Sequence, residues 1–139
     1  MLDLDDFKEI NDSYGHQQGD VVLRKVARVL REASREVDEP ARYGGEELAV
    51  ALPQTDLAGA YNLAERVREG IEALDIPTAE GKRPLKVTAS FGVAALPDSA
   101  TSKDELIAAA DAALYEAKHS GKNRTERAPA RTTKTVSAD

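Results

Sequence analysis

The sequence is organised around RYGGEEL, residues 42–48, in which two glycines and two glutamates lead into the apolar-rich run 47–52. A Gly-Gly pair between two β-type runs indicates a hairpin, because both central residues of a tight primed turn need a positive φ. The two acids directly follow the turn, where folding alone requires none. Carboxylates beside bare glycine backbone suit a hydrated Mg²⁺ and the phosphates it carries. A solvated hairpin with incidental glutamates is the alternative interpretation of these seven residues.

Length, composition and net charge limit the class of protein. A chain of 139 residues is long enough for one domain with a hydrophobic core. Its 41% hydrophobic and 32% charged residues are typical of a soluble globular protein, and the lack of cysteine excludes disulfides and thiolate metal sites. No run has the roughly 18 apolar residues of a membrane helix, and no signal-peptide pattern is present. We therefore expect a cytoplasmic location, no membrane contact by this segment and, from the charge of −6, no nucleic-acid partner.

The segments before the turn predict one strand and two helices. Residues 1–5 alternate apolar and acidic side chains, so this strand places its leucines on one face and its aspartates on the other. Residues 7–14 predict a short helix that ends at Gly15. A longer helix is expected to begin at Gly19 and to continue to about residue 33, with the carboxylate of Asp20 capping its first turn.

The segments after the turn complete an α/β pattern. They predict a helix over 57–74 capped by Asp56, a polar loop over 78–84, an alternating strand over 85–93 and a helix opened by a capping box at 102–105. Residues 125–139 have no periodicity, which is typical of a disordered tail or a linker. The order of elements indicates an α+β sandwich, with helices packed on a mostly antiparallel central sheet.

Four motifs, in order, resemble the GGDEF-domain diguanylate cyclase family over residues 1–124. They are DLDDFK at 3–8 with Asn-Asp at 11–12, GHQQGD at 15–20, RYGGEEL at 42–48 and AKHSGKNR at 117–124. The resemblance implies a βαββαβ core similar to the palm of nucleotidyl transferases, and the joining of two GTP molecules into cyclic di-GMP with release of pyrophosphate. The family's usual N-terminal helix is lacking, so we expect an N-terminally truncated domain whose upstream sensory domain lies outside this chain.

The same resemblance assigns the catalytic acids. It implies that Asp3, Glu46, Glu47 and the main-chain carbonyl of Leu4 bind Mg²⁺ (or Mn²⁺), with Glu47 as a metal ligand or a base. Asp3 ends the first strand and Glu46 begins the hairpin's return, and the resemblance implies that the two meet. Hard oxygen ligands suit Mg²⁺, and in-line attack by a ribose 3′-hydroxyl relies on positioning and electrostatics. A merely polar strand end is the alternative for Asp3.

Residues that match the family's substrate contacts fall into a phosphate group and a base group. Lys118 and Lys122 are four residues apart, which predicts one helical face, although lysines in a last turn also complement the helix dipole. The family more often has arginine at Lys122. A carboxylate accepts from the N1–H and 2-amino groups that guanine has and adenine lacks, so GTP is expected over ATP. The implied set is Asp6, Phe7 and Lys8 through their backbone N–H groups, Lys118, Lys122, and Asn11 with Asp20 at the guanine.

The segment REVD, residues 35–38, matches the inhibitory RxxD motif of the family at its usual distance from the glycine pair. A guanidinium and a carboxylate together can hold a guanine edge and a phosphate, so Arg35 and Asp38, with Arg66, are expected to bind cyclic di-GMP as a feedback inhibitor. The alternative is a surface ion pair at a helix end.

Three classes of function remain after these assignments. An enzyme requires two copies, because each domain holds one GTP and the product is two-fold symmetric, so a homodimer is expected. A catalytically silent receptor for cyclic di-GMP, or a GTP-sensing regulatory module, is the second class. A structural domain is the third, and it leaves the spacing of acids and lysines unexplained. Intact acids at positions 3, 46 and 47 favour the enzyme.

Overall fold

A computed structural model of the protein describes residues 1–79 and 83–131. The described residues form five strands and four helices. In chain order they are β1 Leu2–Leu4, α1 Phe7–Tyr14, α2 His16–Ala33, β2 Glu39–Arg42, β3 Glu47–Ala51, α3 Leu57–Glu72, β4 Ala89–Val93, α4 Lys103–His119 and β5 Thr125–Arg127.

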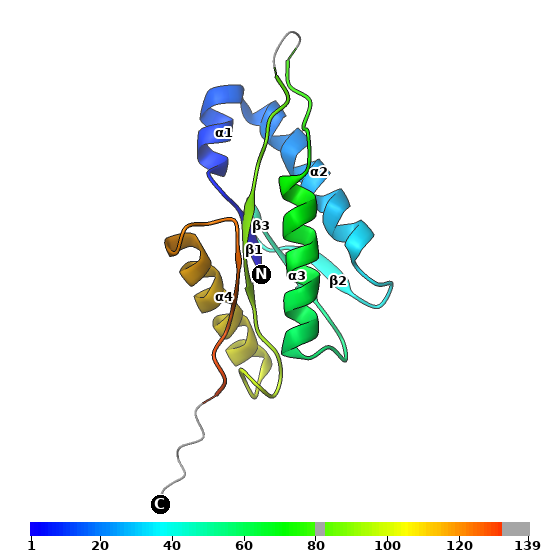
Figure 1. The fold of residues 1–139 in the computed structure, drawn as a ribbon, viewed down its shortest axis with the longest axis vertical. Helices are drawn as coiled ribbons and strands as arrows, with labels where there is room; N and C mark the ends of the chain where they lie inside the picture. The colour runs from blue at the N-terminus through cyan, green and yellow to red at the C-terminus, as the bar shows by residue number, and fades with distance from the viewer. Residues whose placement is uncertain (80–82, 132–139) are drawn as a thin grey trace, which may run out of the picture.

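The strands form one sheet in the order β2-β3-β1-β4-β5. Neighbours are antiparallel except β4 and β5, which run parallel. Figure 1 shows α2 and α3 on one side of this sheet, α4 on the other, and α1 beyond the end of β1. The run from β1 to β4 is βααββαβ, which is the βαββαβ order with two helices, α1 and α2, after the first strand. The predicted α+β class and the mostly antiparallel sheet are therefore confirmed.

The core lies between the sheet and the α2–α3 layer. β1 has only three residues, yet it is central, with Leu2 opposite Leu48 on β3 and opposite Phe91 on β4. Leu2 and Leu4 are buried and belong to the same core cluster as the apolar stripe of α2. The alternation predicted for the first strand therefore turns Asp3 to the opposite face, where α4 lies.

Helix α2 begins earlier than predicted. It starts at His16, and its N-cap is Gly15 at φ 91°, without any side-chain cap. Asp20 lies inside the helix, so its predicted role as an N-cap is wrong. Glycine at positive φ lets the chain leave α1 and enter α2 within one residue, so α2 already begins at His16. The buried stripe of the helix is confirmed at Val22, Val26 and Leu30.

The hairpin is also built differently from the prediction. Four residues, 43–46, join β2 to β3, and neither glycine of the pair has a positive φ, so the primed turn is wrong. The backbone N–H groups of Tyr43 and Gly44 both donate to the carbonyl of Glu47, at 2.7 and 3.1 Å. The guanidinium of Arg42 donates to the carbonyls of Gly44 and Gly45. A longer loop closed in this way does not need the backbone geometry of a two-residue turn.

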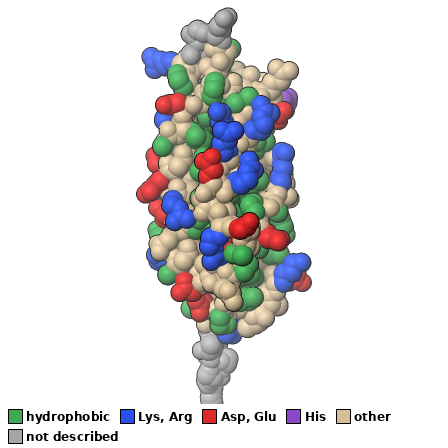
Figure 2. Space-filling model, turned by 90° about the vertical axis from the view of Figure 1, so that its right-hand side faces the viewer, with side chains coloured by type: hydrophobic (Ala, Val, Ile, Leu, Met, Phe, Trp, Pro, Cys, Tyr) green, Lys and Arg blue, Asp and Glu red, His purple; other side chains and the backbone are tan. Residues whose placement is uncertain are grey.

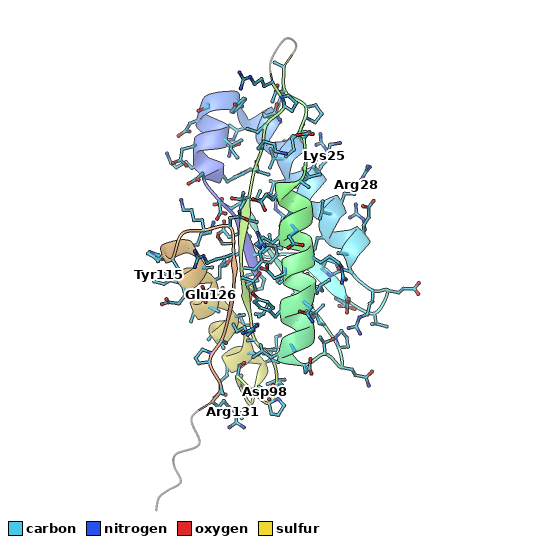
Figure 3. All side chains as sticks on the ribbon, in the orientation of Figure 1. Lys25, Arg28, Asp98, Tyr115, Glu126 and Arg131 are labelled. Carbon is cyan, nitrogen blue, oxygen red and sulfur yellow. The ribbon has the colours of Figure 1, made fainter. Side chains whose placement is uncertain are left out.

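The C-terminal part of the sheet corrects two further expectations. β4 covers only Ala89–Val93, and all five residues are buried because helices cover both of its faces. Residues 125–131 are not a disordered tail, since 125–127 form β5 and the N–H of Arg131 donates to the carbonyl of Asp98 at 2.7 Å. Figure 3 shows Arg131 and Asp98 side by side below α4. The rest of the predicted tail, 132–139, and part of the 78–84 loop lie outside the described residues.

The predicted helix caps are largely confirmed. The carboxylate of Asp56 accepts from the N–H of Gly59 at 2.8 Å, and the hydroxyl of Ser102 accepts from the N–H of Glu105 at 3.2 Å. The reciprocal half of the capping box differs, because the carboxylate of Glu105 accepts from the N–H of Thr101 instead of that of Ser102. The helix predicted over 57–74 ends two residues earlier, at Glu72.

The surface charge is uneven. Figure 2 shows Lys and Arg side chains along the length of the face that α2 and α3 form, and in Figure 3 Lys25 and Arg28 project outward from α2. Among the other arginines of α2 and α3, Arg24, Arg31 and Arg66 are exposed. The formal charge of −6 therefore includes a face with many cations. Of the helices within residues 1–79 and 83–131, none is long and apolar enough to cross a membrane.

The packing of α4 on the sheet depends on Gly92. A Cβ at this position would meet the carbonyl oxygen of Ala110 and the backbone nitrogen of Leu114. We expect Gly92→Ala to lower the free energy of unfolding by about 3 kcal/mol, because the obstacle is backbone, and to lower Tm by roughly 10 °C. Urea and thermal unfolding measure both. Gly45→Ala, which meets no atom within 4 Å, is the control, and a Gly92→Ala variant as stable as the control would contradict this packing.

Candidate active site

The acids expected to meet lie together at one end of β1. In the pairing of β1 with β3, Asp3 lies opposite Glu47, and the N–H of Leu4 points to the carbonyl of Glu46 at 3.5 Å. The Asp3 and Glu46 carboxylates are close enough for each to change the pKa of the other. The hairpin loop thus brings its acid beside the acid of the central strand, as the sequence predicted.

The folded protein disfavours the ionised forms of Asp3, Glu46 and Glu47. Burial raises the pKa of Asp3, and the nearby Lys118 offsets only part of this effect. Burial and then the charge of Asp3 raise the pKa of Glu46. Burial, followed by the charges of Asp111 and Asp3, raises the pKa of Glu47. A cation bound among these oxygens would relieve both the desolvation and the mutual repulsion.

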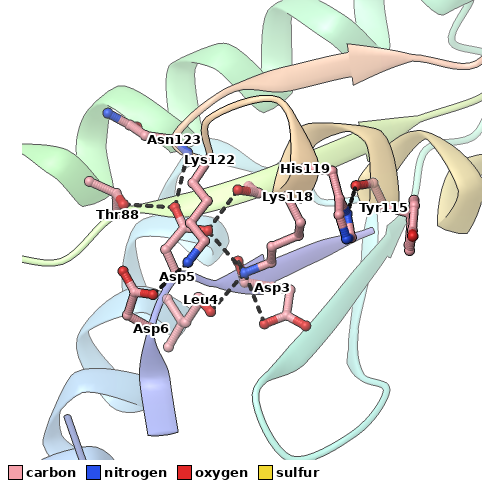
Figure 4. Close-up of polar contacts among 11 residues, drawn as sticks. Asp3, Leu4, Asp5, Asp6, Thr88, Tyr115, Lys118, His119, Lys122 and Asn123 are labelled. Carbon is pink, nitrogen blue, oxygen red and sulfur yellow. Dashed lines mark hydrogen bonds and ion pairs between the residues drawn. The ribbon is translucent and has the colours of Figure 1, made fainter. Parts of the chain in front are cut away.

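The ammonium of Lys118 lies over the end of β1 (Figure 4). It donates to the main-chain carbonyls of Asp3 at 3.2 Å and Leu4 at 2.9 Å, and to the carboxylate of Asp5 at 2.9 Å. It also forms an ion pair with the Asp3 carboxylate at 3.4 Å. One cationic side chain therefore already gathers four oxygens of the kind that a hard metal ion prefers.

One of these oxygens has an unused lone pair. Asp3 Oδ1 is buried and accepts no hydrogen bond from the described residues, although the Lys118 ammonium is near. Within 1–79 and 83–131 no three acidic or histidine side chains group as a metal site. A cation here would therefore rely on the carboxylates of Asp3 and Glu46 together with the carbonyl of Leu4, which are three of the four ligands that the family resemblance implied. The fourth, Glu47, lies opposite Asp3 in the strand pair.

Lys122 reaches the same end of the sheet from a different piece of backbone. Helix α4 ends at His119, so the prediction that Lys118 and Lys122 share one helical face is wrong. Lys122 lies in the loop that follows, at φ 63°, and its ammonium is 2.6 Å from the carboxylate of Asp6. The two lysines nonetheless flank the junction of β1 and α1, where the phosphate contacts were predicted.

The first turn of α1 faces this junction. Its N-cap is Asp6 at φ 57°, and no side chain caps the helix, so the backbone N–H groups at its start are available to an anion. The ring of Phe7 is buried, which leaves only its N–H for the site. The side chain of Lys8 is exposed and pairs with Asp12 at 3.3 Å.

The two residues predicted to read guanine are neighbours across the turn between α1 and α2. Asn11 Oδ1 is buried without a hydrogen-bond partner among the described residues. It lies where a Cβ on Gly19 would be, so glycine at that position permits the close approach. Asp20, the next residue, is exposed. An unsatisfied amide oxygen beside an exposed carboxylate is an arrangement suited to a hydrogen-bonding ligand.

The residues predicted for the product site gather at the C-terminal end of α2. The guanidinium of Arg35 donates to both oxygens of Asp38, at 2.7 and 3.2 Å, and holds the pKa of this buried carboxyl below its usual value. Arg35 also donates to the carbonyl of Pro53 and the hydroxyl of Thr55. Arg66 donates to the carbonyl of Ala33, near Arg35 in the chain. These contacts also fit the alternative of a structural ion pair.

Sequence reasoning missed one buried carboxylate beside the acids. The side chain of Asp5 contacts Lys118 and also accepts from Thr88 and Ser90, both at 2.7 Å. The available signal was the alternation of residues 1–5, which places Asp5 on the same face as Asp3. No pattern in the sequence marked its hydroxyl partners, which precede or lie within an apolar strand.

Known proteins are similar to this chain over most of its length. The family model for "Diguanylate cyclase, GGDEF domain" matches residues 1–124. Diguanylate cyclase A of Treponema denticola is 44% identical over 124 residues, which cover 89% of this chain and 33% of that protein. Response regulator PleD of Caulobacter vibrioides is 43% identical over 123 residues, covering 88% and 27%. The chain thus spans a third or less of the length of these relatives.

Solved structures match over most of their length. The GGDEF domain of DgcB from Caulobacter crescentus, in complex with c-di-GMP, has a TM-score of 0.85 and 35% identity, covering 91% of this chain and 74% of that one. The active GGEEF domain of a diguanylate cyclase from Vibrio cholerae has a TM-score of 0.84 and 30% identity, covering 94% and 81%.

The raised pKa of Glu46 gives a prediction for stability. Its ionised form is disfavoured in the folded protein, so Glu46→Gln at pH 7 should raise the free energy of unfolding by roughly 0.5 kcal/mol, after allowance for solvent screening. The cost of the anion exists above the raised pKa and vanishes below the ordinary value of 4.5. The gain should therefore shrink as the pH falls towards 4.5. Thermal unfolding at several pH values measures it.

Glu39→Gln is the matched control for that measurement. Glu39 is an exposed acid on the neighbouring strand β2, so its removal tests the effect of net charge alone. Equal changes in Tm for the two variants at every pH would contradict a specific repulsion at Glu46.

Proposed function

The chain belongs to the GGDEF-domain family of diguanylate cyclases, and we propose that it joins two GTP molecules into cyclic di-GMP with release of two pyrophosphates. The observation that carries this proposal is the convergence of Asp3, the Leu4 carbonyl and Glu46 beside Lys118. Such a set of acids with adjacent cations is suited to transfer of a nucleotidyl group, in which charge must be neutralised on the phosphate.

A divalent cation, Mg²⁺ or Mn²⁺, is the proposed cofactor. The Asp3 oxygen that accepts no hydrogen bond from the described residues and the disfavoured anion of Glu46 support this proposal, since both would be stabilised by a cation. When bound, the cation would neutralise charge on the α-phosphate and orient the triphosphate. Glu47 faces Asp3 across the strand pair and is the candidate for a further ligand or for the base that accepts the 3′-hydroxyl proton.

The triphosphate is proposed to lie at the junction of β1 and α1. Lys118 and Lys122 supply positive charge from two sides, and the uncapped first turn of α1 supplies backbone N–H groups from Asp6 to Lys8. These groups would fix the α-phosphate for in-line attack, so the residues of the chain contribute mainly positioning and charge.

The base is proposed to be guanine, held by Asn11 and Asp20. The buried amide oxygen of Asn11 lacks a partner among the described residues, and a ligand N–H would satisfy it. The carboxylate of Asp20 could accept from N1–H and the 2-amino group, which adenine does not offer. Because one domain offers one such site, the symmetric product requires a homodimer whose two sites face each other.

Feedback inhibition by cyclic di-GMP is proposed at Arg35, Asp38 and Arg66. Arg35 is about half exposed while paired with Asp38, so its guanidinium can accept a second partner. Arg66 lies at the same end of α2. If the acids at β1 fail to support turnover, the same three residues would make the domain a receptor for cyclic di-GMP, which is the second candidate function.

The catalytic proposal predicts that Glu46→Gln loses activity while gaining stability. Product formation should fall roughly 100-fold or more, because the variant removes a ligand of the cation that neutralises the reacting phosphate. Chromatography of cyclic di-GMP after incubation with GTP and Mg²⁺ measures it, with the chain fused to a dimeric coiled coil so that dimerisation is not limiting. Glu39→Gln is the control, and full turnover by Glu46→Gln would refute the metal role.

The feedback proposal predicts that Arg35→Ala weakens inhibition by cyclic di-GMP at least about tenfold, since a charged hydrogen-bond donor is lost. The variant should also unfold at a lower Tm, because Asp38 stays buried with fewer partners. Titration of initial rates with cyclic di-GMP gives the inhibition constant. Arg66→Ala should weaken inhibition with little change in stability. Inhibition unchanged in both variants would leave Arg35 and Asp38 as a structural ion pair.

A further inference from the structure

Asp5 is the most deeply buried acid at the end of β1, at 4% exposure. Its Oδ1 accepts from Ser90 at 2.7 Å and Lys118 at 2.9 Å, and its Oδ2 accepts from Thr88 at 2.7 Å and from the backbone N–H of Asn123 at 3.0 Å. The donors come from the chain just before β4, from β4 itself, from α4 and from the loop after α4. One carboxylate therefore joins four segments (Figure 4).

This carboxylate is built to remain ionised. Its oxygens accept from two hydroxyl groups, one ammonium and one backbone N–H, and all four are donors to the carboxylate. A buried anion is tolerated only where its acceptor sites are filled, and each Asp5 oxygen has two donors. Asp5 differs in this from Asp3, which keeps an oxygen without a hydrogen bond.

Lys118 depends on Asp5 for its position. Its other acceptors, the carbonyls of Asp3 and Leu4, belong to the set proposed for the cation. Asp5 has no free acceptor to offer a ligand, so it can keep the ammonium in place when those oxygens serve another partner. The ion pair at 2.9 Å would then fix where the positive charge of Lys118 stands beside a phosphate.

Lys122 depends on Asp5 through the loop that carries it. Gly121, Lys122 and Asn123 have φ values of 121°, 63° and 46°, and two of these residues are not glycine. Such a backbone costs of order 1–3 kcal/mol per strained residue and persists only where its surroundings hold it. The Asn123 N–H binds Asp5, while its side chain is held between Arg68 and Glu72, each at 3.0 Å.

We propose that Asp5 is a positioning residue that sets both phosphate-binding lysines, Lys118 by a direct ion pair and Lys122 through the N–H of Asn123. It would touch neither nucleotide nor cation. This inference rests on the proposed function, because it requires that the two lysines bind the triphosphate.

Asp5→Asn tests the proposal by the sign of its effect on binding. Removing a negative charge beside a polyanion would by itself tighten binding. Loss of lysine positioning should instead raise Kd about tenfold, the scale of one charged hydrogen bond. Titration calorimetry at 10 °C should show this loss for a non-hydrolysable GTP analogue with Mg²⁺ and also for pyrophosphate with Mg²⁺.

Thr88→Val is the matched control, because it removes one hydrogen bond from Asp5 but leaves the charge and the Lys118 contact. We expect its Kd to stay within about twofold of the wild type even though its Tm falls. If Asp5→Asn does not fold, Asp5→Ser, which leaves space for a water in place of the carboxylate, gives the same comparison.

The outcomes separate this inference from the function on which it rests. A wild-type chain that binds neither probe would overturn the proposed function. A wild-type chain that binds both, with an Asp5→Asn variant that binds equally well or more tightly, would overturn only the positioning role and leave Asp5 a purely structural residue. A Kd raised for both probes, with Thr88→Val unchanged, is the result we expect.

Discussion

The contact between the Lys118 ammonium and the end of β1 is the interaction on which the candidate site depends. It satisfies two main-chain carbonyls and shares one positive charge between Asp3 and Asp5. Without it, two partly or fully buried carboxylates would face each other with no cation between them, which is costly in a medium of low polarity. Lys118 comes from the last helix and Asp3 from the first strand, so the site forms only when α4 has docked on the sheet.

The sheet topology explains why the candidate site residues lie at the end of β1, although this strand is short. β1 lies at the centre of the sheet, so segments converge on its end from both sides. The hairpin loop arrives beside it on β3, the chain entering β4 supplies Thr88, and α1 starts two residues beyond it. A residue such as Glu46 becomes a neighbour of Asp3 through antiparallel register, although the two are remote in the chain.

The sequence predicted those parts of the site that local patterns control. Alternation in residues 1–5 placed Asp3 on the face away from the leucines, whereas the meeting of Asp3 with Glu46 was implied by the family resemblance. Prediction from the sequence failed where a residue has a positive φ, and where the site is built from several segments that are far apart in the chain. The start of α2 at Gly15 and the position of Lys122 both depend on a positive φ, and β5 is a three-residue parallel strand without periodicity. The role of Asp5 could not be predicted, because its four hydrogen-bond donors come together only in the folded protein.

Negative and positive charges lie on different sides of β1 at this end of the sheet. Asp5 and Asp6 each have a lysine within 2.9 Å, so the acids at the start of α1 are largely neutralised. Asp3, Glu46 and Glu47 share weaker compensation, and all three have raised pKa values. The unbalanced negative charge is thus confined to the side of β1 that faces the hairpin, while the lysines stand on the side that faces α1. A bound cation and a polyphosphate would each meet the charge opposite to their own, next to one another, without any large movement of the backbone.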